Sequence, residues 1–116
     1  MALESAAPAP ELRLEAEKKG PTQVLVHCYG RMVSGSAPTL QSTIRPLIND
    51  NKLVVLDLTD VTFLDSSGLG TIVGLWVNAK RNHCDLKLIR LSARLKDLLS
   101  MSHLSMLEGD QEYFGF

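Results

Sequence analysis

The residues of this chain best suited to chemistry form a short polar segment, Asp65-Ser66-Ser67-Gly68. The segment stands between an apolar run that ends at Leu64 and a second apolar stretch that begins at Leu69. A helix that starts here has about four backbone N–H groups without partners and a partial positive charge. A phosphate on a serine hydroxyl at this place could accept hydrogen bonds from those groups. The segment therefore fits a phosphorylation site, and it also fits a plain helix cap, because Asp, Ser and Gly are preferred there.

The helix expected after this segment has a smooth outer face. Its apolar side, with residues spaced by three and four, consists of Leu69, Ile72, Val73, Trp76 and Val77. The opposite side has no charge and almost no bulk, and it consists of Ser67, Gly70, Thr71, Gly74 and Asn78. A solvated helix face normally carries Lys, Glu and Arg, and each glycine costs about 1 kcal/mol relative to alanine. We therefore expect this face to be covered, either by a partner protein or by the chain's own tail.

No pattern of catalytic or metal-binding residues accompanies this segment. The sequence contains no G-x-x-x-x-G-K, G-x-G-x-x-G or G-x-S-x-G motif. His27 and Cys28 are neighbours on an expected strand, so they face opposite sides and cannot share a metal. His83 with Cys84, and His103 alone, have no further ligands close in sequence. We therefore predict a protein that is not an enzyme and that needs no metal or cofactor.

The composition is that of one ordinary globular domain. The chain has 116 residues, with 12 Lys and Arg, 13 Asp and Glu, and 45% hydrophobic residues. A formal net charge of -1 argues against direct nucleic-acid binding and against attachment to an anionic membrane surface. Two cysteines outside any C-x-x-C pair indicate a reducing, cytoplasmic setting. The longest charge-free run, 66–79, is too short for a membrane span, and the N-terminus lacks a secretory signal.

The strands that must position the polar segment follow from apolar patterning. Residues 1–10 are expected to be a flexible leader, and residues 11–116 a single domain. Alternation over 12–17 predicts a strand with one face in water, and the apolar runs 23–29 and 53–58 predict strands covered on both faces. A turn at 59–60 is expected to separate a short segment, 61–64, from the strand before it. Further strands are expected at 86–91 and within 106–116, where the end of the chain forms a tail.

Helices are expected between these strands. Ser36 and Pro38 suit the start of the first helix, and Pro46 should kink or shorten it before its end near residue 50. The second helix follows Ser66, and Ser92 caps a third. Alternating strands and helices predict an α/β fold in which helices pack against a small mixed sheet with parallel neighbours.

The sequence resembles a STAS domain, specifically a bacterial anti-sigma factor antagonist. The resemblance runs from about Leu12 to Glu112. Its most specific part begins at Leu56-Asp57-Leu58 and continues through the segment from Phe63 to Gly70. The order of the expected elements supports the same family independently.

The resemblance implies a partner switch in sigma-factor control. The unphosphorylated protein would bind an anti-sigma factor that is also a serine kinase, and the kinase would phosphorylate Ser66 to end the binding. A serine phosphatase would reset the cycle. The remaining contacts are assigned to the partner-binding residues Asp65, Ser67, Gly68, Leu69, Gly70, Thr71, Gly74 and Asn78. The residues alone leave open whether Ser66 or Ser67 accepts the phosphate, which anti-sigma factor and signal are involved, and the oligomeric state.

Three features depart from the family pattern. Gly30 is followed by Arg31, where family members often have an acidic residue. His103 replaces the glycine that usually ends the third helix, so His103 is expected to adopt a left-handed conformation. The family usually closes with another helix, whereas this chain stops at Phe116.

An alternative function within the same family is compatible with the changed residues after Gly30. The chain would then be the STAS subunit of a membrane transport complex, such as a phospholipid-trafficking ABC transporter. The second helix would dock on the ATPase subunit of that complex, and no serine cycle would be needed.

Overall fold

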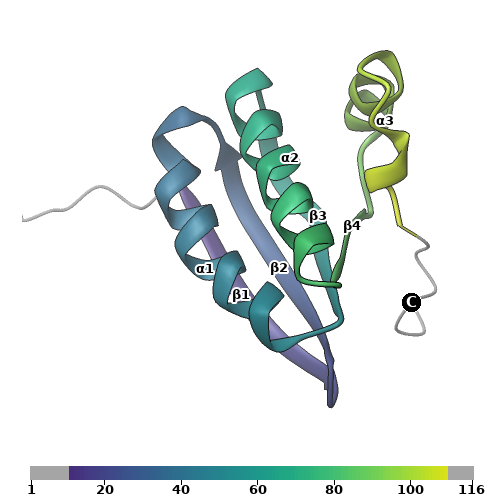
Figure 1. Cartoon of the computed structure of the whole chain (residues 1–116). Coiled ribbons are helices and arrows are strands. Elements are labelled where there is room, and N and C mark those ends of the chain that lie inside the picture. The colour runs from purple at the N-terminus through teal and green to yellow at the C-terminus, as the bar shows by residue number, and fades with distance from the viewer. Residues whose placement is uncertain (1–10, 110–116) are drawn as a thin grey trace, which may run out of the picture.

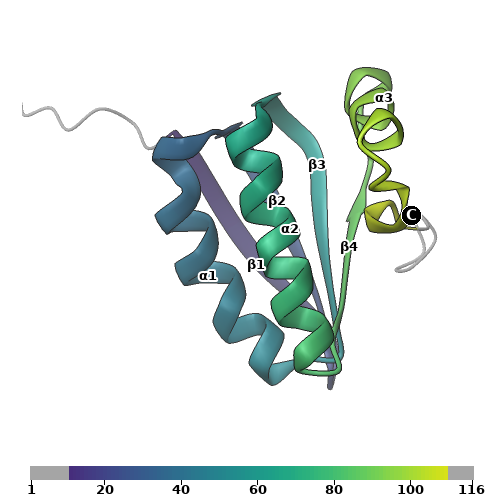
Figure 2. The ribbon, with the colours of Figure 1, turned by 45° about the horizontal axis from the view of Figure 1, so that its top comes forward.

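The protein is a layer of helices packed on one small sheet. A computed structural model describes residues 11–109; the expected leader and residues 110–116 of the expected tail lie outside the described residues. The elements are β1 (Leu12–Gly20), β2 (Gln23–Met32), a 3-10 turn (Ser34–Ser36), α1 (Ala37–Asp50), β3 (Leu53–Leu64), α2 (Ser66–Arg81), β4 (Asp85–Ile89), α3 (Ala93–Met101) and a second 3-10 turn (Ser105–Leu107). Helices α1 and α2 lie side by side on the same face of the sheet (Figures 1 and 2).

The sheet has four strands in the order β1-β2-β3-β4. Strand β1 pairs with β2 in antiparallel fashion, while β3 is parallel to both β2 and β4. Each parallel connection crosses through a helix, as short parallel units require. The α/β class and the mixed sheet with parallel neighbours are therefore confirmed.

Strand β3 is the centre of the molecule because apolar residues cover it on both sides. Val54 and Leu56 belong to the main core beneath the helices, and Val55 belongs to a second buried cluster on the opposite face with Leu25 and Ile89. This arrangement confirms the expectation that the apolar runs in β2 and β3 are buried on both faces.

Strand β3 is longer than the sequence suggested, and the turn expected at 59–60 is wrong. The strand continues to Leu64 because β2 supplies a parallel partner along its whole length, with pairs that include Gly30↔Val61 and Met32↔Leu64. One register shift, between the pairs His27↔Asp57 and Tyr29↔Asp60, accommodates Thr59 of the expected turn, and Asp60 pairs within the ladder. Strand β1 is also longer than the expected 12–17, reaching Gly20, because its pairing with β2 continues through Lys18↔Val24 and Gly20↔Gln23.

In the described part of the expected final strand, residues 106–109, the chain makes only a short contact with β4. Residues Ser105–Leu107 form a 3-10 turn, after which Glu108 makes an isolated parallel bridge with Leu88. The backbone N–H of Gly109 donates to the Leu88 carbonyl at 2.6 Å. His103 has a φ of 57°, so the left-handed conformation expected at the end of α3 is confirmed. In the described part of the chain, the helices fall short of the length and apolar character that crossing a membrane requires.

Helix α1 runs unbroken through Pro46, contrary to the expected shortening. Its buried side, which includes Leu40, Ile44 and Ile48, holds both halves of the helix against the core. Pro46 itself is exposed, so the carbonyl that loses its helical partner there lies on the solvent side. Packing therefore overrides the local penalty of the proline.

Replacement of Pro46 should stabilise the protein. The substitution Pro46→Ala restores a helical N–H and is expected to raise the free energy of unfolding by up to about 3 kcal/mol. Pro38→Ala is the matched control, because Pro38 lies in the first turn, where a proline is well tolerated. Thermal unfolding followed by circular dichroism should show a higher midpoint for Pro46→Ala alone. An equal response from both variants would contradict the assignment of strain to Pro46.

Candidate functional site

The start of α2 is fixed by Asp65. Its carboxylate oxygen Oδ1 accepts a hydrogen bond from the Gly68 backbone N–H at 2.9 Å, and its own backbone N–H donates to the Met32 carbonyl at 3.3 Å. Asp65 is therefore the helix N-cap, with extended backbone geometry. The Asp65 side chain, expected to bind a partner, is therefore engaged in capping the helix.

Gly68 lets the first turn of α2 press against the end of β2. A Cβ atom built at Gly68 would lie 2.0 Å from the Met32 carbonyl oxygen, far closer than any contact between real atoms. Gly68 and the following Leu69 are buried. These two residues support the first turn of α2 from its buried side, and they are not part of its exposed outer face.

Ser66 and Ser67 stand exposed at the first two positions of α2. The Ser66 side chain makes no hydrogen bond to any residue in the described range 11–109. The Thr71 hydroxyl donates to the Ser67 backbone carbonyl at 3.0 Å, and the Ser67 hydroxyl likewise makes no hydrogen bond to a described residue. Because Asp65 performs the capping, neither serine hydroxyl is needed to satisfy the helix start. The helix cap and an exposed serine hydroxyl therefore occupy adjacent residues.

The outer face of α2 is smooth, as expected. A Cβ atom added at Gly70 or Gly74 would meet nothing within 4 Å, so the described chain does not cover these positions. Thr71 and Asn78 are half-buried on the flank of the helix. The glycines are thus not required by close packing, in contrast with Gly68.

The apolar side of α2 differs from the expected one in detail. Leu69, Ile72, Leu75 and Ala79 are buried, whereas Val73 and Trp76 are half-buried. Val77 is 40% exposed and borders the smooth face, so its assignment to the buried side is wrong. The difference arises because the helix contacts the sheet along a stripe centred on Ile72, which places Val77 more than a quarter-turn away.

A cationic and aromatic pair lies where β2 and β3 end. Arg31 and Phe63 are register partners, and the Arg31 guanidinium carbon is 5.5 Å from the centroid of the Phe63 ring. Phe63 is 44% exposed. The position where the family often carries an acidic residue thus presents a positive charge, on the strand next to the one that leads into Ser66.

Asp57 has a structural role that the sequence did not reveal. Its buried carboxylate accepts hydrogen bonds from the backbone N–H and the hydroxyl of Thr59, at 3.0 and 2.6 Å. The other oxygen lies 3.4 Å from Nδ1 of His27 and 3.9 Å from the Arg90 guanidinium. The two bonds from Thr59 fix the local backbone of β3 beside the Asp57 carboxylate. The sequence signal for them is an Asp followed by a Thr two residues later.

The histidines and cysteines do not assemble a reactive site. Cys28 packs in the main core while the neighbouring His27 faces Glu17 and Asp57, as expected for adjacent strand residues. Burial raises the pKa of the Cys28 thiol, and the nearby Asp57 charge raises it further. Burial also raises the pKa of Cys84. Within residues 11–109, no group of three or more His, Cys, Asp or Glu residues is arranged to hold a metal ion.

Comparison with known proteins gives one consistent family. The family model of the STAS domain matches residues 13–109. The chain is 33% identical to an anti-sigma-B factor antagonist of Bacillus subtilis (strain 168) over 87 residues, which cover 75% of this chain and 80% of that relative.

Solved structures show the same fold. The anti-sigma factor antagonist SpoIIAA in its unphosphorylated form matches with a TM-score of 0.72 at 16% identity, over 86% of this chain and 90% of that one. The Bacillus cell fate determinant SpoIIAA in the phosphorylated form matches with a TM-score of 0.68, also at 16% identity, over 86% and 94% of the two chains.

Glycines on the two sides of α2 should respond in opposite ways to substitution. Gly74→Ala is expected to raise the free energy of unfolding by about 0.5–1 kcal/mol, because it improves helix propensity without a clash. Gly68→Ala should lower it by about 1–3 kcal/mol, because the new methyl group overlaps the Met32 carbonyl. Urea unfolding measures both. A loss of stability in Gly74→Ala would show that the smooth face is packed within the folded chain.

Proposed function

The chain belongs to the STAS family of anti-sigma factor antagonists, and we propose that it works as a phosphorylation-controlled binding module. With a free hydroxyl on Ser66 it binds an anti-sigma factor and so releases a sigma factor for transcription. With a phosphate on Ser66 it lets the anti-sigma factor go. The anti-sigma factor is itself the serine kinase in this scheme, and a serine phosphatase reverses the modification.

One observation carries the proposal: Ser66 is exposed at the first position of α2, and its hydroxyl makes no hydrogen bond to a described residue. The helix start does not use its hydroxyl, because Asp65 supplies the cap. A kinase can therefore reach the hydroxyl without opening the fold. The helix N-terminus also accommodates the phosphate product without unfolding, because anionic groups are favoured there.

The electrostatics of the outer face explain how one phosphate can reverse binding. Ser67, Gly70 and Gly74 present a neutral surface that a partner can cover with little desolvation cost. A phosphate adds about -1.5 to -2 charges beside this surface, next to the carboxylate of Asp65. Burial of that charge without a matched cation costs several kcal/mol, and each 1.4 kcal/mol changes affinity tenfold.

The chain is proposed as a substrate and a ligand, and its partners supply the chemistry. The kinase transfers the terminal phosphoryl group of ATP to the Ser66 Oγ, which loses its proton, and ADP leaves. The phosphatase adds water across the phosphate ester and restores the hydroxyl. Described residues around Ser66 offer a capped helix, a neutral face and the Arg31–Phe63 pair, which serve recognition.

Two substitutions at Ser66 should have opposite effects on binding of the anti-sigma kinase. Ser66→Ala is expected to retain the anti-sigma kinase and Ser66→Asp to lose it, with at least a tenfold difference in affinity. Wild-type and variant chains serve as baits in lysate of the source cell, and mass spectrometry identifies the bound proteins. Ser100→Ala and Ser100→Asp are the matched controls, because Ser100 is an exposed serine on α3, outside the proposed docking surface. The proposal fails if Ser66→Ala and Ser66→Asp hold the kinase equally, and a transport ATPase retained by all baits would support the alternative function.

Added bulk on the smooth face should weaken binding without harming the fold. Gly74→Lys places a long charged side chain on an open position and is expected to reduce affinity for the kinase at least roughly tenfold. Lys80→Ala, a change of one exposed residue farther along α2, is the control. Calorimetric titration with the purified kinase measures affinity, and circular dichroism verifies folding. Unchanged affinity for Gly74→Lys would place the interface elsewhere.

A further inference from the structure

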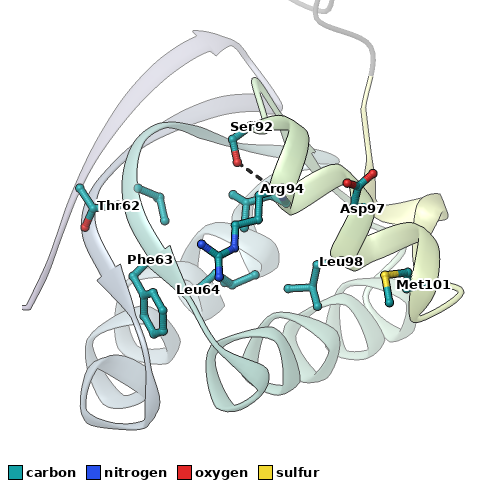
Figure 3. A pocket seen from close by; sticks show the side chains of 10 residues that line it. Thr62, Phe63, Leu64, Ser92, Arg94, Asp97, Leu98 and Met101 are labelled. Carbon is teal, nitrogen blue, oxygen red and sulfur yellow. Dashed lines mark hydrogen bonds between the residues drawn. The ribbon is translucent and has the colours of Figure 1, made fainter.

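A groove runs between the end of β3 and helix α3, beside the surface already described. Its volume is about 400 Å³, within the range of ligand-binding clefts. The walls are apolar, with Val61 and Leu64 on the strand side and Leu95 and Leu98 on the helix side. Figure 3 shows Leu64 on the strand and Leu98 on the helix, with both side chains in the space between the two elements. The strand wall ends at Leu64, the residue before Asp65 and Ser66 in the chain.

The mouth of the groove exposes two large apolar side chains. Phe63 is 44% exposed and Met101 is 81% exposed, and both line the groove. Large exposed apolar side chains that gather at one hollow are typical of a protein–protein contact. In such a contact an apolar side chain of the partner fills the hollow.

Arg94 gives the groove its charge. Its guanidinium extends from α3 across the groove toward Phe63 and Leu64 (Figure 3), and it forms no ion pair with any residue in the described range 11–109. Asp97 lies at the rim, on the side of α3 away from those two residues. Arg31, the other cation near this end of β3, lies against the Phe63 ring. The groove thus combines apolar walls with a positive charge that has no ion-pair partner among the described residues.

The place of Arg94 in its helix shows that helix stability does not require it. Arg94 is in the first turn of α3, where a positive charge opposes the helix dipole and where acidic residues are favoured. Ser92 already caps this helix by accepting the Leu95 N–H at 3.2 Å. A cation at this position weakens the helix slightly, so its presence fits a role in binding.

We infer that this groove binds a large apolar side chain of the partner that is flanked by an acidic side chain, with Arg94 as the residue that selects for the acid. The apolar side chain contacts the strand and helix walls, and the carboxylate pairs with the Arg94 guanidinium in a bidentate contact. The inference rests on the proposed function only for the identity of the protein that presents these two side chains. The chemistry of recognition follows from the groove itself.

The test uses short random peptides displayed on phage, selected against the purified full chain. The selected peptides should pair Asp or Glu with a large apolar residue. Arg94→Glu should weaken their binding at least roughly tenfold. Lys96→Glu is the matched control, since it makes the same charge change on α3 at a residue that faces Glu108 and does not line the groove. Arg94→Glu places an acid in the first turn and should leave the thermal midpoint unchanged or higher, which excludes unfolding as the cause.

Each other outcome overturns the inference. Selected peptides that lack acidic residues, that bind Arg94→Glu as well as wild type, or that fail to emerge at all would show that the groove does not recognise this chemistry. Self-association that Arg94→Glu abolishes, measured by analytical ultracentrifugation, would assign the groove to a second copy. Peptide binding that emerges only after deletion of residues 110–116 would assign it to the chain's own end. Selection needs no anti-sigma factor, so these results are independent of the Ser66 experiment.

Discussion

The contact between Gly68 and the Met32 carbonyl is the constraint on which the candidate site depends. Helix α2 approaches the end of β2 so closely that no side chain fits between them. This contact, together with the bond from the Asp65 N–H to the same carbonyl, sets where the helix begins and how it is rotated about its axis. The rotation buries Leu69 and turns Ser66 and Ser67 outward. A wider approach would leave the two serines without a defined place.

The same helix therefore serves two requirements on opposite sides. Its buried stripe, which includes Ile72 and Leu75, contributes to the main core and supports the fold. Its outer face carries Gly70 and Gly74 in open space, where each glycine weakens the helix by about 0.5–1 kcal/mol. Stability is given up on the face that contacts nothing in the described chain, which fits a surface kept flat for another protein.

The distribution of charge near the candidate site differs between the outer face of α2 and the neighbouring elements. The outer face of α2 is neutral, whereas Arg31 and Arg94 lie at the neighbouring ends of β2 and α3. A neutral face favours contact over a large area, and the cations Arg31 and Arg94 favour a partner with acids in matching places. A phosphate on Ser66 would place negative charge beside the neutral face. Recognition and release would thus depend on different residues.

The sequence by itself determined the fold class, the family resemblance and the polar segment that begins α2, because these depend on local patterns: apolar periodicity, capping residues and glycines. It also indicated the left-handed conformation at His103. It wrongly predicted a turn at 59–60 and a helix shortened at Pro46, since the β2 ladder and the buried side of α1 outweigh local preference there. Only the tertiary structure separated Gly68, which must be small, from Gly70 and Gly74, which need not be. It alone brought Phe63 and Arg94 to one groove, because residues some thirty positions apart meet there through the packing of a strand against a helix.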